Sequence, residues 1–174
     1  MGADGPVGLI TYMRTDSVRI AREAQEEARQ WANQRFGTEY VPQTPPVYRS
    51  RGSAQEAHEA IRPTEVGREP RAVAQFLTKD QLALYRLIWE RFLASQMTPA
   101  VYDTVSADIE AGRCLFRAQG ATLKFKGFMA VYVEGREDEA EDEAESQVPP
   151  LEEGEVLALL GLDQIGRASC RERV

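Results

Sequence analysis

The chain has 174 residues, of which 43% are hydrophobic, enough for the core of one ordinary domain or of two small ones. It has no run of about 18 apolar residues, and residues 1–6 lack the features of a signal peptide, which makes a cytoplasmic protein the default expectation. The net charge is −7, but residues 135–155 alone hold ten acidic residues and one arginine, whereas residues 1–98 hold 13 basic and 12 acidic ones. The acidity therefore does not exclude phosphate contacts by the first 98 residues.

The first predicted element is a short strand over residues 8–14. Period-two alternation places Ile10, Tyr12, Arg14 and Asp16 on one face and Leu9, Thr11 and Met13 on the other. The polar residues that follow predict the N-cap of a helix beginning near Val18. The start of that helix would favour an anion nearby, because its first N–H groups are unpaired and the helix dipole is positive there.

Four helical stretches are predicted from Val18 onward. Apolar residues recur every three or four positions from Val18 to Phe36, and Gly37 follows as a C-cap. Residues 53–56 form a capping box, which predicts a short helix through Ala60 that Pro63 ends. Another short helix is predicted over residues 71–77, and a second capping box at residues 78–81 opens a long amphipathic helix that closes before Pro99. Between the first two helices, the prolines of residues 38–51 predict an extended surface connection.

The pattern changes to strands after Pro99. Strands are predicted over residues 101–109, 114–118, 122–125 and 128–133, separated by glycines, and a last one begins at Val156. The acidic run at residues 137–145 is interpreted as a solvated loop and rejected as a metal site. Cys114 and Cys170 indicate neither a disulfide nor a zinc site. The predicted fold class is α+β, with a helical domain followed by a small antiparallel β domain.

Tyr12 is the candidate for chemistry, although a tyrosine in a short apolar strand is more often part of a core. A phenol has an ordinary pKa of about 10, so it is a weak nucleophile until a neighbour helps to remove its proton. Arg14 could stabilise charge on a phosphate with two N–H groups, or it could simply pair with Asp16. His58, the only histidine, lies in the string from Glu56 to Thr64, and a lone histidine is usually structural.

These two strings, residues 8–17 and 56–64, resemble the signature motifs of bacterial DNA topoisomerase I, a type IA topoisomerase. The resemblance implies that Tyr12 breaks and rejoins one DNA strand, with Arg14 beside it and His58 at the cleaved phosphate. It further implies an orienting role for Asp16, DNA contacts for Thr11 and Thr15, and a DNA or structural contact for Arg62. The similarity is strongest from Gly5 to Met97 and weaker beyond.

The resemblance also implies partners and a cofactor. The expected partners are single-stranded and negatively supercoiled DNA and the rest of a topoisomerase chain, with no membrane and a monomeric state. The expected location is the bacterial cytoplasm, at the nucleoid. The family uses Mg²⁺ held by an acidic cluster that precedes the tyrosine. Because only eleven residues precede Tyr12, the chain is interpreted as an internal fragment that binds no metal and is inactive alone.

The predicted organisation has five parts. Residues 1–98 form the tyrosine-bearing helical domain, residues 99–134 begin a β hinge domain, residues 135–155 form an acidic loop and residues 156–164 form a final strand. Residues 165–174 resemble a translated sequencing adapter and are excluded as an artefact. Two alternatives to the enzyme stay open: a single-stranded DNA-binding module without chemistry, and a structural arm whose tyrosine is core.

Overall fold

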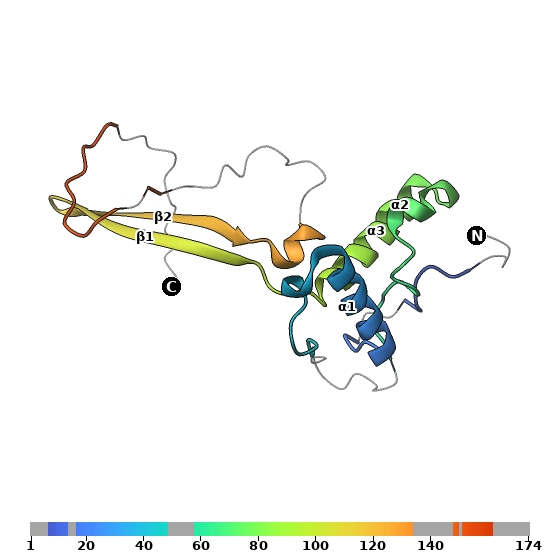
Figure 1. Cartoon of the computed structure of the whole chain (residues 1–174). Coiled ribbons are helices and arrows are strands. Elements are labelled where there is room, and N and C mark those ends of the chain that lie inside the picture. The colour runs from blue at the N-terminus through green and yellow to red at the C-terminus, as the bar shows by residue number, and fades with distance from the viewer. Residues whose placement is uncertain (1–6, 14–16, 49–57, 134–147, 150, 162–174) are drawn as a thin grey trace, which may run out of the picture.

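The structure, a computed structural model, describes residues 7–13, 17–48, 58–133, 148–149 and 151–161. Within these residues, three α-helices gather at one end and two long antiparallel strands project from them as a ribbon (Figure 1). Helices and strands are segregated along the chain, so the predicted α+β class is confirmed. None of the described helices is both long enough and apolar enough to cross a bilayer.

Helix α1 spans Arg22–Phe36 and buries three alanines at i, i+4 and i+8 against the core, namely Ala24, Ala28 and Ala32. It ends at Gly37, whose φ of 102° is a conformation that glycine adopts without steric cost, as predicted. The predicted start near Val18 is wrong. Residues 17–21 are extended toward a distant segment instead, because the Ala60 amide donates to the Arg19 carbonyl at 2.7 Å.

The second helical unit follows the sequence signals closely. Helix α2 spans Pro70–Val73, with proline in the first turn, and a 3₁₀ turn at Ala74–Phe76 continues it. Helix α3 spans Lys79–Ala94 and starts with the predicted capping box. Its apolar face packs on α1, where the rings of Trp31 and Trp89 meet edge to face with centroids 5.1 Å apart. The core therefore lies between α1 and α3.

The ribbon has fewer strands than predicted. Strand β1 spans Val101–Ala111 and β2 spans Cys114–Phe125. The predicted break at Gly120 is wrong, because Gly120 pairs with Val105 inside a continuous antiparallel ladder. The predicted strand at residues 128–133 is also wrong. That segment opens with a 3₁₀ turn, Gly127–Ala130, which returns the chain to the helices.

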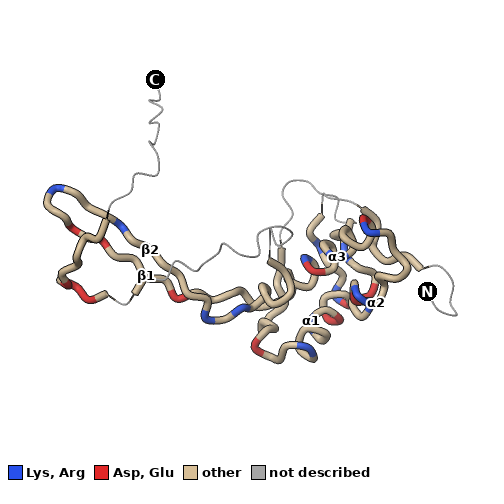
Figure 2. The backbone as a smooth tube through the Cα atoms, turned by 90° about the horizontal axis from the view of Figure 1, so that it is seen from above, with Lys and Arg blue, Asp and Glu red and all other residues tan. Residues whose placement is uncertain are grey.

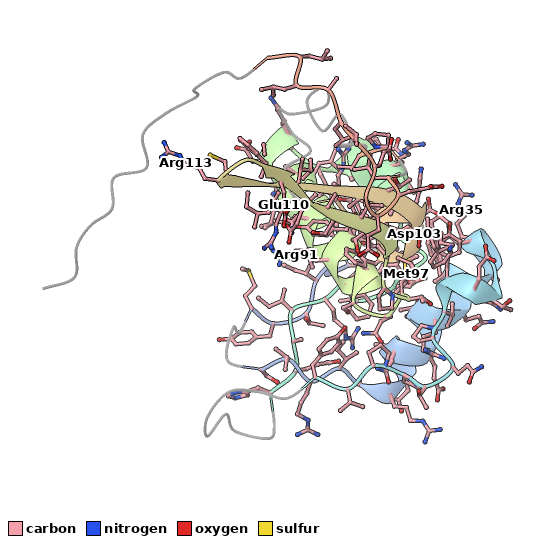
Figure 3. The ribbon with its side chains drawn as sticks, turned by 90° about the vertical axis from the view of Figure 1, so that its left-hand side faces the viewer. Arg35, Arg91, Met97, Asp103, Glu110 and Arg113 are labelled. Carbon is pink, nitrogen blue, oxygen red and sulfur yellow. The ribbon has the colours of Figure 1, made fainter. Side chains whose placement is uncertain are left out.

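The helices hold the foot of the ribbon, while its tip stands free of them (Figure 1). The Thr98 amide donates to the Tyr40 carbonyl at 2.9 Å, and the rings of Tyr40 and Phe125 lie with centroids 4.7 Å apart. Viewed toward the ribbon end, the Arg113 side chain at the turn points away from the rest of the molecule (Figure 3). Charged residues of both signs are interspersed over the helices and along the ribbon (Figure 2).

Two further predictions fail where they can be compared with the structure. Residues 58–60 are not helical, so the predicted helix does not reach Ala60, and its part at residues 53–57 lies outside the described residues. Residues 156–161 form no strand, and the side chains of Val156 and Leu160 are almost fully exposed. Most of the predicted acidic loop, residues 162–164 of the predicted last strand and the predicted artefact at residues 165–174 also lie outside the described residues.

Candidate functional site

The site lies at a junction, where the segment that carries Tyr12 pairs with the segment that follows His58. The structure has a single antiparallel bridge here, between Ile10 and Pro63, where a strand was predicted. Two backbone hydrogen bonds flank it: the Thr11 amide donates to the Arg62 carbonyl at 2.9 Å, and the Thr64 amide donates to the Leu9 carbonyl at 3.0 Å. Ile10 and Pro63 themselves exchange no hydrogen bond in this pattern, so the missing N–H of Pro63 costs the pairing nothing.

Tyr12 lies directly after this bridge and faces the solvent. Its side chain is 79% exposed, whereas the side chains of Leu9 and Ile10 pack against the core. The possibility that this tyrosine is part of the core is therefore excluded for the described structure. The hydrogen bonds beside the bridge hold the backbone immediately before Tyr12. The exposed ring is therefore attached to a fixed stretch of chain.

Thr11 uses its hydroxyl inside the protein. The hydroxyl donates to the Ala60 carbonyl at 3.2 Å, with the Arg62 carbonyl also within reach at 3.4 Å, and accepts from the Arg62 amide at 3.0 Å. The bonds cross 49 and 51 residues of sequence. The structure thus brings the two motifs together through backbone and side-chain atoms of Thr11.

Ser17 makes a second connection between the motifs. Its side chain is buried, its hydroxyl donates to the His58 carbonyl at 2.6 Å, and it accepts from the Arg19 amide at 3.2 Å. The backbone of His58 is therefore fixed to the chain a few residues after Tyr12. The imidazole belongs to a half-buried residue at the same junction.

Glu59 and Arg62 form the charged part of the junction. The Arg62 Nε donates to Glu59 Oε1 at 2.7 Å, Nη2 donates to Oε2 at 3.3 Å, and Nη1 donates to the Pro63 carbonyl at 3.0 Å. Glu59 Oε1 also accepts from the Ala21 amide at 2.8 Å. The Arg62 side chain is only 14% exposed, so these contacts favour the structural alternative for Arg62 over the DNA contact.

The electrostatics of Glu59 follow from these contacts. Desolvation by partial burial raises the pKa of its carboxyl, but the hydrogen bonds from Arg62 and from the Ala21 amide, with the charge of Arg62, outweigh that effect. The net result is a pKa below its ordinary value of 4.5. Glu59 is therefore ionised at neutral pH, and its carboxylate is hydrogen-bonded to the Arg62 side chain and to the Ala21 amide.

Helix α3 holds the stretch of chain that follows the junction. The Tyr85 hydroxyl donates to the Arg68 carbonyl at 2.6 Å, and the indole N–H of Trp89 donates to the Val66 carbonyl at 2.9 Å. Burial raises the pKa of Tyr85 to about 12, so this phenol stays protonated and keeps its donor role. The chain that leaves the bridge is thereby fixed to the longest described helix.

The predicted site residues divide into two groups. The structure brings Tyr12, Thr11, His58 and Arg62 to one junction, while Arg14, Thr15 and Asp16 lie outside the described residues. Sequence reasoning missed Ser17 as a connecting residue and Glu59 altogether. The available signal for Glu59 was its place beside His58 within the second motif.

No cluster of three or more histidine, cysteine, aspartate or glutamate side chains that could hold a metal ion occurs among the described residues.

Comparison with known proteins decides the family. A sequence profile of the DNA topoisomerase family matches residues 6–167. The structure is similar to full-length topoisomerase I from Thermotoga maritima, with a TM-score of 0.70 and 38% sequence identity. The chain belongs to the bacterial type IA DNA topoisomerase family. The structural match covers 89% of this topoisomerase chain and 23% of the Thermotoga maritima protein. The resemblance seen in the two motifs is thus confirmed.

Proposed function

We propose that Tyr12 is the nucleophile with which this topoisomerase sequence opens one DNA strand, as part of an enzyme that relaxes negatively supercoiled DNA. The observation that carries the proposal is the placement of Tyr12. Its phenol is 79% exposed, and its segment is hydrogen-bonded to the segment that contains His58. A nucleophile for a macromolecular phosphodiester must be reachable from solvent and must also be held in position.

The proposed reaction is a transesterification that conserves the number of phosphodiester bonds. The Tyr12 oxygen attacks the phosphorus of a single-stranded segment, the bond between phosphorus and the 3′ oxygen breaks, and the 5′ phosphate becomes attached to the tyrosine. The phenol loses its proton and the 3′ oxygen gains one. After a second strand has passed, the 3′ hydroxyl attacks the phosphotyrosine and restores the DNA, so no nucleotide cofactor is consumed.

The other residues of the two motifs are proposed to serve this step. Arg14 would stabilise negative charge on the phosphoryl oxygens, His58 would contact the phosphate or its sugar, and Asp16 would orient His58 or Arg14. Thr15 is proposed to contact DNA. For Thr11 and Arg62, whose polar atoms are engaged within the protein, the proposed DNA role rests on their place in the motifs.

Type IA topoisomerases use Mg²⁺, and the described residues contain no cluster of three or more metal-binding side chains to which a step could be assigned. We propose that the ion is bound by another part of the enzyme and that the 174-residue chain alone neither cleaves nor relaxes DNA efficiently. The proposed setting is a monomeric enzyme on DNA in the bacterial cytoplasm, at the nucleoid.

The decisive experiment grafts residues 6–167 into the Thermotoga maritima enzyme in place of the matching segment. The graft is incubated with single-stranded DNA labelled at its 3′ end, and a denaturing gel detects label attached to protein. We expect an adduct that depends on a divalent metal ion and disappears in Tyr12→Phe. Tyr48→Phe is the matched control, because Tyr48 is also exposed and its hydroxyl donates to the Ser95 carbonyl.

The same experiment separates the two alternatives. Salt-dependent binding of the oligonucleotide without any adduct would favour the DNA-binding module. An adduct that persists in Tyr12→Phe would show that another residue is the nucleophile. A graft that is folded but neither binds nor cleaves DNA would favour a structural arm, in a form whose tyrosine is exposed.

A further inference from the structure

Glu59 joins two parts of the molecule that the sequence separates. On one side it accepts a hydrogen bond from the Ala21 amide, at the start of α1, from 38 residues away. On the other side it pairs with Arg62, whose backbone amide and carbonyl both bond to Thr11. The same carboxylate therefore touches a helix end and the side chain of Arg62, whose backbone holds the segment that presents Tyr12.

The contact with α1 supplies an acceptor for the backbone amide of Ala21, the N-cap residue of the helix. Ala21 precedes the helix and makes no side-chain cap, since alanine has no polar side-chain atom. A carboxylate at a helix N-terminus satisfies an unpaired amide and is attracted by the helix dipole. Because α1 is 15 residues long and buries three alanines in the core, it gives Glu59 a rigid reference point.

The neighbouring bonds make the link short and stiff. The His58 carbonyl, one residue before Glu59, accepts from the Ser17 hydroxyl, and the Ala60 amide, one residue after it, donates to the Arg19 carbonyl. Three consecutive residues are thus held against residues 17–21. A small rotation of residues 58–60 would move the imidazole of His58 together with the backbone that precedes Tyr12.

We infer that Glu59 is a positioning residue of the cleavage site, which fixes His58 and the Tyr12 segment relative to α1. The inference rests on the proposed function of Tyr12. Glu59 reaches no DNA itself in this role and acts through the groups on both sides of it. Loss of the carboxylate should therefore lower the rate of the covalent step while leaving the binding of DNA nearly unchanged.

The test uses the graft described above and measures the single-turnover rate of adduct formation at increasing DNA concentration. We expect Glu59→Ala to lower the maximal rate by roughly 10- to 100-fold, the range that a misplacement of about 1 Å can cause. The DNA concentration for half-maximal rate should change by less than about twofold, because no uniform binding contact is lost. Glu59→Gln keeps an acceptor for the Ala21 amide and should recover part of the rate.

Glu65→Ala is the matched control. Glu65 pairs with Arg68 at 2.7 Å with the same spacing of three residues, in the neighbouring stretch of chain, and its carboxylate is not part of the link to α1. Its rate should equal that of the unsubstituted graft. An equal loss in both variants would show a general effect of removing an ion pair and would overturn the inference.

A second measurement needs no chemistry. His58 is the only histidine, so its imidazole gives a unique NMR signal in the 174-residue chain. Glu59→Ala should shift the signals of His58 and Tyr12 and accelerate hydrogen exchange at the Ala21 and Ala60 amides, while α3 amides keep their protection. Unchanged signals at these sites would overturn the inference.

The outcomes also separate this inference from the proposed function. If the unsubstituted graft forms an adduct and Glu59→Ala forms it at the same rate, the positioning role is wrong and Tyr12 stays the nucleophile. If the unsubstituted graft is folded and forms no adduct, the proposed function fails, and the catalytic role of Glu59 fails with it.

Discussion

Adjacent residues at the bridge have opposite surroundings. Thr11 is half-buried and hydrogen-bonded to the second motif, whereas Tyr12 is exposed. Extended backbone sends neighbouring side chains to opposite sides, so one residue can anchor the segment while the next faces the solvent. The anchor and the proposed nucleophile thus occupy two consecutive positions.

Thr11→Val tests the anchor. Valine has the same shape but leaves the Arg62 amide without the hydroxyl acceptor, so we expect a loss of about 1 to 3 kcal/mol in the free energy of unfolding. Urea denaturation followed by tryptophan fluorescence measures it. Thr122→Val, at an exposed position of β2, should change stability little, and equal losses in the two variants would contradict the anchoring role.

Glu59 makes stability depend on pH in a defined direction. Its pKa is lower in the folded state than its ordinary value of 4.5, so its stabilisation is complete above that value and is lost as the pH falls through the folded-state pKa. We measure the free energy of unfolding of the wild-type chain and of Glu59→Gln by urea denaturation from pH 7 to about pH 3. The difference between the two free energies should shrink as the pH falls. A constant difference over this range would show that the carboxylate charge does not contribute.

At the scale of elements, α3 is the support on which the site is built. Its side chains donate from Tyr85 to the Arg68 carbonyl and from Trp89 to the Val66 carbonyl, just beyond the bridge. Both are aromatic residues of the buried face, so each one fills the core and satisfies a backbone carbonyl. The start of α3 is fixed by its own capping box, where Thr78 and Gln81 exchange hydrogen bonds.

Thr78→Ala should destabilise the chain by about 1 kcal/mol, because it leaves the Gln81 amide unpaired at the helix start. Thermal unfolding followed by circular dichroism measures the effect. Lys79→Ala, one residue later in the same exposed turn, keeps the cap and is the control. A Thr78→Ala variant as stable as the control would mean that core packing alone determines where α3 begins.

At the scale of the whole molecule, the ribbon is held to the helices at its two feet. Gly127 makes this attachment possible. Its φ is +49°, and a Cβ atom there would lie 2.4 Å from the carbonyl oxygens of both Thr98 and Pro99. The two ends of the ribbon therefore approach each other backbone to backbone, and the Phe128 amide closes the contact by donating to the Thr98 carbonyl.

Gly127→Ala should cost roughly 2 to 3 kcal/mol of unfolding free energy, since it adds a steric clash to an unfavourable backbone conformation. Gly112→Ala at the ribbon tip is the matched control. Gly112 also has a positive φ, +61°, but nothing lies within 4 Å of an added Cβ, so only the backbone cost of about 1 kcal/mol applies. Equal losses measured by urea denaturation would show that the close approach at Gly127 is unimportant.

The local signals in the sequence predicted most of the helices, and the roles of the site residues stay predictions. The capping box at Thr78, the glycine that ends α1 and the alternation along β1 each act over a few residues, so each could be interpreted without knowledge of the fold. The two motifs indicated the family for the same reason. The division of the chain at residue 98 into two domains stays a prediction.

Three of the failures have a common cause. The helix predicted to start near Val18 starts at Arg22, and residues 58–60 are not helical, because these two segments bond to each other. Gly120 was interpreted as a break but pairs with Val105 in the ladder. In each case a partner distant in sequence satisfies backbone groups that the local pattern assigned elsewhere.

The sequence by itself determined the family and the main helices, because these depend on residue types at short spacings, and it predicted roles for Tyr12 and His58. Only the tertiary structure decided that Tyr12 is exposed and that Thr11 and Ser17 join the motifs. It also decided that a carboxylate from Glu59 accepts from the Ala21 amide at the start of α1. These contacts cross about forty to fifty residues of chain, and no local periodicity can specify hydrogen bonds between segments that meet only after folding.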